Sequence, residues 1–336
     1  MAGLDEASSR SRFTCSGSVT FPSGTRSVAV VPRIKISPAT ATTITCLRAP
    51  REPLPNTCTN GATSHTTGYA VPTFVVDGGH GPRLFFGQDR LHFVKEVLAQ
   101  HPMAAAKEGE HTVAAPTLLT PTTVANEGRR VIFYYDLASP FAYLGATQIE
   151  RVAKRCGAVV DYRPILLGGL FRSLGTPMVP LHTYPEAKQR HTHEDLHRWA
   201  RYYDEPFRFP HRFPMSTVTA QRLLICAKSH ERIGALTLAL FRAYWADDQD
   251  LADPAVLEAA LRAVGLPESL LEEAVSPAIK EQLHKYTDEA QALGVFGVPT
   301  FVVEKKAGPP ALIFGQDRLL FVEKALLGTL GDDGAA

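Results

Sequence analysis

A serine and a proline, Ser139-Pro140, lie shortly after a run of β-branched and aromatic residues, Val131 to Tyr135. Serine is favoured as the N-cap of an α-helix and proline at the first helical position, so the pair predicts a helix start. The same geometry would put a hydroxyl beside free backbone N–H groups at the positive end of the helix dipole, where it can stabilise a bound thiolate. Ser139 is therefore either a cap alone or a residue that holds a thiolate, and as a serine it cannot carry out dithiol exchange.

A second pattern, His193-Glu-Asp-Leu-His197, matches the motif H-E-x-x-H. On a helix the two histidines would share a face suited to zinc, with Glu194 as a general base. No Gly-x-x-His follows, and no suitably spaced glutamate offers a third ligand. We therefore expect a solvated, histidine-rich helix face here and no metal site.

The elements that must position Ser139 follow a definite order between residues 129 and 328. A strand at 131–135, a helix at 141–156 and a strand at 158–166 form a β-α-β unit, which favours a parallel pair of strands. The later segments are predicted to be a helical stretch, two short strands and a last helix, at 168–292, 300–303, 311–314 and 317–327. This order predicts an α/β thioredoxin-like fold with a large all-helical insertion between its β-α-β and β-β-α halves.

In that fold order, a proline opens the third strand in Val298-Pro299-Thr300. It is either a proline tolerated at a strand edge or the cis-proline of the thioredoxin plan, which exposes the preceding main chain to an extended peptide such as glutathione. Gln316 and Asp317 open the last helix, either as a capping motif or as contacts for the charged end of the same tripeptide. Together with Ser139, these residues predict a glutathione site.

Residues 71–98 and 298–327 form an internal repeat that shares VPTFVV, GP, FGQDRL and FV. The first copy is a β-β-α tail that is too small to form a core of its own. We interpret it as the remnant of a gene fusion, with the alternative that it competes for the place of the second copy in the sheet. The predicted organisation is a disordered Ser/Thr-rich segment, the partial repeat, a linker, the thioredoxin-like domain and a tail, at 1–67, 68–100, 101–128, 129–328 and 329–336.

The chain has 336 residues, of which 45% are hydrophobic and 21% charged, with a formal net charge of +1. This composition is typical of a soluble globular protein, and the near-neutral charge gives no reason to expect nucleic acid or a membrane surface as a partner. No apolar run approaches the roughly 20 residues of a membrane helix. The five cysteines form no C-x-x-C motif and no evident disulfide framework, which favours a reducing compartment, and we expect the cytoplasm.

Five segments resemble the 2-hydroxychromene-2-carboxylate isomerase family, a DsbA-like branch of the thioredoxin fold related to kappa-class glutathione transferases. They are FYYDLASPFAYLG (133–145), LLGGLFRSLGTP (166–177), RWARYYDEPF (198–207), GVFGVPTFVV (294–303) and FGQDRLLFVEKAL (314–326). By this resemblance Ser139 is the catalytic serine, Val298 beside Pro299 is the main-chain glutathione contact, and Gln316 with Asp317 contacts the glutamyl end. The resemblance also favours a homodimer.

The resemblance implies glutathione-dependent isomerisation of an unsaturated aromatic pyruvate, a small electrophile, by thiolate addition, bond rotation and elimination. The substrate carboxylate needs a cation or polar donor, for which Arg172, His182 and Lys188 are candidates. A kappa-like transferase that conjugates glutathione to electrophiles is the nearest alternative, because it would share the same binding site. A non-catalytic module that binds thiol peptides is an alternative of another class, and it predicts that Ser139→Ala leaves its function intact.

Overall fold

The computed structural model describes residues 33–34, 44–47, 72–77, 82–99, 128–304 and 308–330. Most of the segment predicted to be disordered, the predicted linker up to residue 127 and the last residues of the predicted tail lie outside these ranges. Within the described residues, no helix combines the length and the apolar character that crossing a bilayer requires.

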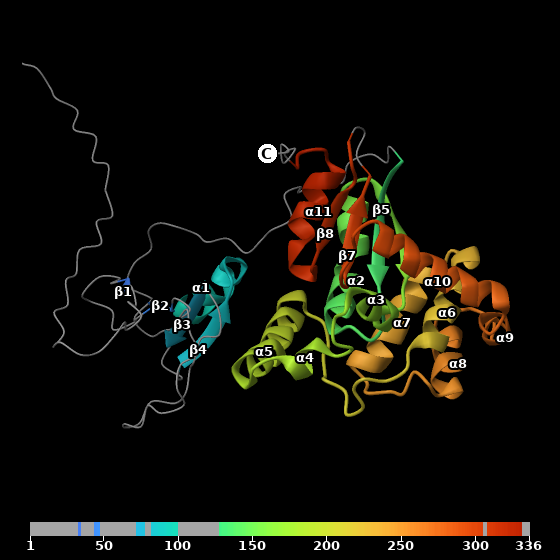
Figure 1. Ribbon diagram of the computed structural model, residues 1–336, viewed down its shortest axis with the longest axis horizontal. Coiled ribbons are helices and arrows are strands. Elements are labelled where there is room, and N and C mark those ends of the chain that lie inside the picture. The colour runs from blue at the N-terminus through green and yellow to red at the C-terminus, as the bar shows by residue number, and fades with distance from the viewer. Residues whose placement is uncertain are drawn as a thin grey trace, which may run out of the picture.

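A mixed four-stranded sheet forms the centre of the main domain (Figure 1). Its order is β6-β5-β7-β8, with β5 parallel to β6 and antiparallel to β7, and β7 antiparallel to β8. The strands are β5 Arg129–Tyr135, β6 Ala158–Pro164, β7 Thr300–Val303 and β8 Ala311–Phe314. Aromatic side chains hold neighbouring strands together, because the rings of Phe133 on β5 and Phe301 on β7 stack with centroids 5.2 Å apart.

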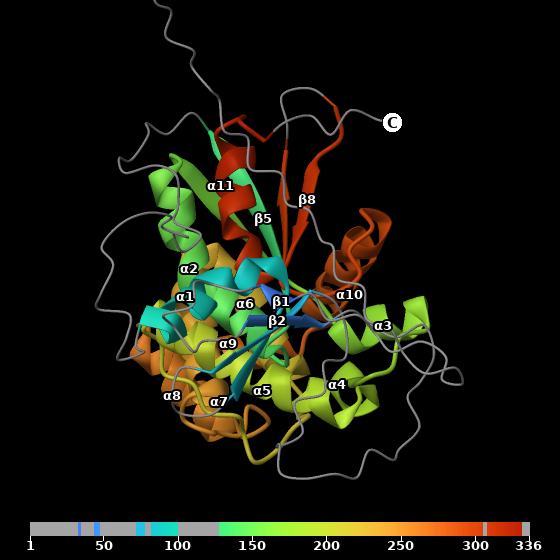
Figure 2. The same ribbon diagram turned by 90° about the vertical axis from the view of Figure 1, so that its left-hand side faces the viewer.

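Helices cover both faces of this sheet (Figure 2). The long helix α2, Pro140–Arg155, and the last helix α11, Leu319–Leu326, lie on one face, and α10, Pro277–Ala292, lies on the other. Between β6 and α10 the chain forms α3 Leu167–Leu174, α4 Pro180–Thr183, α5 Glu186–Tyr203, α6 Val218–Ala227, the short 3₁₀ helix η3 Lys228–His230, α7 Ile233–Trp245, α8 Pro254–Ala263 and α9 Leu270–Ala274. The predicted thioredoxin-like fold with a helical insertion is confirmed.

The described part of the first repeat copy, residues 72–77 and 82–99, lies beside α5; we call it the N-terminal repeat (Figure 1). It contains β3 Thr73–Asp77, β4 Pro82–Phe86, the 3₁₀ helix η1 Gln88–Arg90 and α1 Leu91–Ala99. Its strands do not join the main sheet but a second one of order β1-β2-β3-β4, with β1 at Arg33–Ile34 and β2 at Ile44–Leu47. In the main sheet, β7 and β8 of the second copy keep their own place.

Candidate active site

Ser139 is the N-cap of α2, as the serine-proline pair predicts. Its backbone is extended, and its Oγ accepts a hydrogen bond from the Ala142 amide at 3.2 Å. The residue is 6% exposed, so the hydroxyl lies inside the fold at the positive end of a 16-residue helix. Capping therefore accounts for one of the hydrogen bonds that this hydroxyl makes.

The other hydrogen bond leads to the predicted proline loop. The Val298-Pro299 peptide bond is cis, and the Ser139 hydroxyl donates to the Val298 carbonyl oxygen at 3.4 Å. Gly145 on α2 permits this approach, because a Cβ at that position would lie 3.3 Å from Pro299 Cγ and 3.3 Å from Phe301 Cζ. Two predicted site residues, 159 positions apart, thus lie in direct contact.

Asp136, three residues before Ser139, organises the loop between β5 and α2. The residue is 4% exposed, and its carboxylate accepts hydrogen bonds from the amides of Ala138 and Leu167 and from the Thr217 hydroxyl, all at 2.9 Å. Burial raises the pKa of Asp136, while these donors favour its ionised form. Asp136 is not among the residues predicted from the sequence, although an acid at the end of a buried strand is a signal that could have indicated it.

The turn that opens the last helix is joined to the proline loop through its main chain. Gly315, with a φ of 103°, donates its amide to the Pro299 carbonyl at 3.0 Å, and the 3₁₀ helix η4, Gln316–Arg318, follows. Gln316 is 2% exposed, and its main-chain carbonyl accepts a hydrogen bond from the Tyr203 hydroxyl at 3.0 Å. Among the described residues, the side-chain nitrogen Nε2 of Gln316 has no hydrogen-bond partner.

Asp317 is engaged by a residue that the sequence analysis did not connect with it. Arg90 of the N-terminal repeat donates to the Asp317 carboxylate at 2.7 Å. Burial raises the pKa of Asp317, and the guanidinium groups of Arg90 and Arg318 oppose this effect. The identical tetrapeptides GQDR at 87–90 and 315–318 are the sequence signal that could have pointed to this contact.

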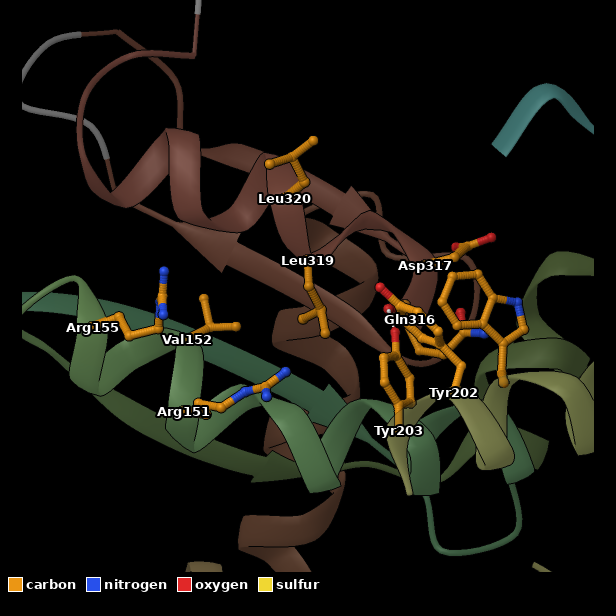
Figure 3. A pocket seen from close by; sticks show the side chains of 10 residues that line it. Arg151, Val152, Arg155, Tyr202, Tyr203, Gln316, Asp317, Leu319 and Leu320 are labelled. Carbon is orange, nitrogen blue, oxygen red and sulfur yellow. Dashed lines mark hydrogen bonds between the residues drawn. The ribbon is translucent and has the colours of Figure 1, made fainter. Parts of the chain in front are cut away.

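A cavity of about 260 Å³ opens beside Gln316 and Asp317 (Figure 3). It is bounded by α2, α5, η4 and α11, with Arg151 at one side and Tyr203 at another. Ser139 and Val298 are not among its lining residues. The cavity therefore shares only Gln316 and Asp317 with the predicted glutathione site.

The three candidate cations lie on α3, α4 and α5. Arg172, near the end of α3, and His182, in α4, are exposed, and the His182 ring contacts Phe213 with centroids 6.3 Å apart. The Lys188 ammonium lies 3.6 Å from the centre of the Tyr184 ring. Within the described residues, no hydrogen bond, ion pair or ring contact joins these side chains to Ser139, Val298 or Gln316.

The two histidines of the H-E-x-x-H pattern lie on α5 and contact aromatic rings. His193 lies against Phe209 and His197 against Phe207, with ring centroids 4.5 Å and 5.0 Å apart. Glu194 pairs with Arg198 one turn further along the helix. The part of the chain that the structure describes holds no cluster of three His, Cys, Asp or Glu residues suited to a metal ion.

The described cysteines cannot supply a thiolate at Ser139. Cys156 and Cys226 are buried and unpaired, as expected for small core residues. Burial raises the pKa of the Cys156 thiol to about 11 and that of Cys226 to about 12. Both groups are therefore protonated at neutral pH, and neither is a source of thiolate for the start of α2.

Comparisons with known proteins match the same part of the chain, the domain that holds Ser139 and Pro299. Residues 130–327 match the family model of the DSBA-like thioredoxin domain. The 2-hydroxychromene-2-carboxylate isomerase of Sphingobium xenophagum is 31% identical over 206 residues, which cover 59% of this chain and 98% of the isomerase. Human glutathione S-transferase kappa 1 is 26% identical over 202 residues, which cover 57% of this chain and 88% of the transferase. A solved structure of a 2-hydroxychromene-2-carboxylate isomerase matches with a TM-score of 0.51 and 25% identity, covering 59% of this chain and 94% of that one.

The fold and the serine that faces a cis-proline define a thioredoxin-like domain, and the chain belongs to the DSBA-like thioredoxin family. Its relatives in that family include isomerases of 2-hydroxychromene-2-carboxylate and kappa-class glutathione transferases. The resemblance stated from the sequence is confirmed.

Proposed function

We propose that the chain is a glutathione-dependent isomerase of the 2-hydroxychromene-2-carboxylate type, in which Ser139 holds the glutathione thiolate. One observation carries the proposal. The Ser139 hydroxyl lies 3.4 Å from the Val298 carbonyl at the cis-proline, in a domain that aligns with 98% of the length of such an isomerase.

The residues around this point fit glutathione in three ways. The main chain of Val298, beside the cis bond, suits an extended peptide. The Gln316 Nε2 group is a buried donor without a partner among the described residues, a costly state that a ligand acceptor would relieve. The Asp317–Arg90 pair offers one carboxylate and one guanidinium, which match the ammonium and the carboxylate of a glutamyl end.

When bound, glutathione supplies a nucleophilic thiolate whose addition turns a double bond of the substrate into a rotatable single bond, before elimination restores the double bond without net redox change. The Ser139 hydroxyl would donate its hydrogen to sulfur in place of the Val298 carbonyl, while still accepting from the Ala142 amide. The positive end of α2 favours the negative charge. The domain's further task is to place the electrophile, for which Arg172, His182 and Lys188 remain the predicted carboxylate contacts.

A kappa-like transferase is the second candidate, because human glutathione S-transferase kappa 1 is 26% identical over 202 residues. The two activities share the binding site and differ in the product. An isomerase returns free glutathione, whereas a transferase releases glutathione attached to the electrophile.

Calorimetry with glutathione, combined with ultraviolet titration of the bound thiol, tests the proposal on the wild-type chain and on Ser139→Ala. Ser276→Ala is a matched control, because Ser276 also precedes a proline and caps a helix, accepting from the Ile279 amide at 3.4 Å. Each substitution should cost about 1 kcal/mol of cap stability. Only Ser139→Ala should raise the pKa of the bound thiol, by about 1–2 units, since a hydrogen bond to a charged group contributes about 1.5–3 kcal/mol.

Equal thiol pKa values in both variants would remove Ser139 from the mechanism and favour the thiol-peptide binder. An absence of binding at millimolar glutathione would reject the glutathione site as a whole. If binding is found, mass spectrometry of the products of 2-hydroxychromene-2-carboxylate distinguishes an isomer from a glutathione conjugate.

A further inference from the structure

The two repeat copies meet each other in the fold. Arg90 of the N-terminal repeat pairs with Asp317 at 2.7 Å, and Arg318 pairs with Asp89 at 2.6 Å. Arg90 is the repeat equivalent of Arg318, and Asp89 is the equivalent of Asp317. Each copy therefore gives its arginine to the aspartate of the other, which is the exchange that a twofold axis produces in an isologous interface.

The N-terminal repeat also contacts α5, an element outside the repeat. Arg90 pairs with Asp195 at 2.9 Å and lies 5.2 Å from the centre of the Trp199 ring. Phe93 is 4% exposed, and its ring packs edge-on against Trp199 with centroids 5.2 Å apart and against Tyr202 at 5.9 Å. The docking face therefore consists of η4 and of the α5 side chains Asp195, Trp199 and Tyr202.

The other half of this pseudo-symmetric arrangement is unfilled. Phe321, the equivalent of Phe93, is 41% exposed. Phe314, the equivalent of Phe86, is 42% exposed, whereas Phe86 contacts the His191 ring on α5 with centroids 6.5 Å apart. The described part of the first copy contains no counterpart of α5, and the Phe314 ring packs instead against that of Phe296, itself 52% exposed, with centroids 4.7 Å apart. A second whole domain would bring an α5 to them.

We propose that the face formed by η4 and α5 is built to bind the β-β-α tail of a second copy of the domain, and that the N-terminal repeat occupies it in this chain as an internal substitute for that partner. Without the repeat, two domains would form equivalent ion pairs, in which Arg318 of each domain pairs with Asp317 of the other. Phe314 and Phe321 of each would then lie against α5 of its partner. The chain with its repeat is a monomer, and the domain without it is a dimer.

The proposal concerns which segment covers a surface and does not rest on the reaction, although Arg90 and Asp317 also belong to the proposed glutathione site. It predicts the mass in solution whether or not glutathione binds, so its failure and the failure of the proposed function are separately observable.

Sedimentation velocity and light scattering of residues 1–336 and of residues 128–336 test the proposal. The shorter chain contains all of the matched residues 130–327, which correspond to 98% of an isomerase relative, so it comprises a complete domain. We expect residues 1–336 to have the mass of one copy and residues 128–336 that of two copies. Arg318→Glu in the shorter chain should return it to one copy, since like charges would then face each other across the axis.

If residues 128–336 fold but have the mass of one copy, the proposal is overturned. The same holds if residues 1–336 have the mass of two copies. If residues 128–336 fail to fold by circular dichroism, the full chain with Asp89→Lys and Arg90→Glu replaces them. A shift to the mass of two copies supports the proposal, and an unchanged mass overturns it. The matched charge reversal of a distant surface pair, Arg130→Glu with Glu304→Lys, should leave the mass unchanged.

Discussion

Phe93 and Phe321 occupy equivalent positions of the repeat but different surroundings, and the same substitution at both measures what α5 contributes. Phe93 is 4% exposed and faces two aromatic rings of α5, whereas Phe321 is 41% exposed. Truncating a buried phenylalanine costs about 3–5 kcal/mol, of which aromatic pairing contributes about 0.5–1.5 kcal/mol. Because part of the Phe93 ring is buried within the repeat itself, we expect Phe93→Ala to weaken docking by about 3 kcal/mol. Phe321→Ala should cost less than about 1 kcal/mol.

Native-state hydrogen exchange of the α1 amides, Leu91–Ala99, reads this difference directly. A loss of about 3 kcal/mol corresponds to about 100-fold lower protection of α1 in Phe93→Ala. In Phe321→Ala the protection of α1 should stay close to wild type. The emission of Trp199, which is 1% exposed, should also shift to the red in Phe93→Ala only. Equal loss of α1 protection in both variants would refute the reasoning, since the contact with α5 would then carry no docking free energy.

Three further predictions concern single side chains. Burial lowers the pKa of His92 from 6.5 to about 4, and the positive charge of Arg90 acts in the same direction. The imidazole is therefore neutral while the N-terminal repeat is docked, and it takes up a proton below about pH 6.5 when the repeat undocks. Docking measured by tryptophan emission should therefore weaken as the pH falls from 6.5 towards 4, and His92→Leu should flatten that dependence. Asp136→Asn should lower the free energy of unfolding, measured in urea, by about 2–3 kcal/mol, because the side-chain amide would turn N–H groups towards backbone N–H donors. A loss below about 0.5 kcal/mol would mean that the native carboxyl is already protonated and already turns an O–H towards one of these donors. Gly145→Ala adds a methyl group 3.3 Å from Pro299 Cγ, so the KM for glutathione should rise several-fold while kcat changes little, and an unchanged KM would show that the proline loop yields freely.

Most of the fold could be predicted from the sequence because its elements carry strong local signals. The short apolar strands β7 and β8 were predicted with the bounds that the structure has, and the serine-proline pair marked the start of α2. Element order then favoured one topology, since β-α-β units give parallel pairs and β-β hairpins antiparallel ones. The contact of Ser139 with Val298 followed from that topology, although the two residues are 159 positions apart.

The surroundings of Asp317 could not be predicted in the same way. The sequence showed that GQDR occurs twice, but two copies of one turn carry the same charges, and no periodicity indicates that they face each other. Arg90 and Asp317 are 227 positions apart, and their pairing depends on how the N-terminal repeat docks on α5. The role of Asp136 could not be predicted for a similar reason, because its hydrogen-bond partners lie in three separate segments of the chain.

The differences between the two repeat copies follow the surfaces that each copy meets. The second copy packs on α2, where Glu323 is fully buried and pairs with Arg155. The first copy has no α2 beneath it in the described residues, and its equivalent residue, Lys95, is exposed. The identical run FGQDRL, by contrast, supplies the residues that the two copies exchange across the pseudo-axis. The copies are also identical over VPTFVV, outside these ion pairs, so what favours the N-terminal repeat as an internal substitute for a second domain is the exchange of Arg90 and Arg318 itself.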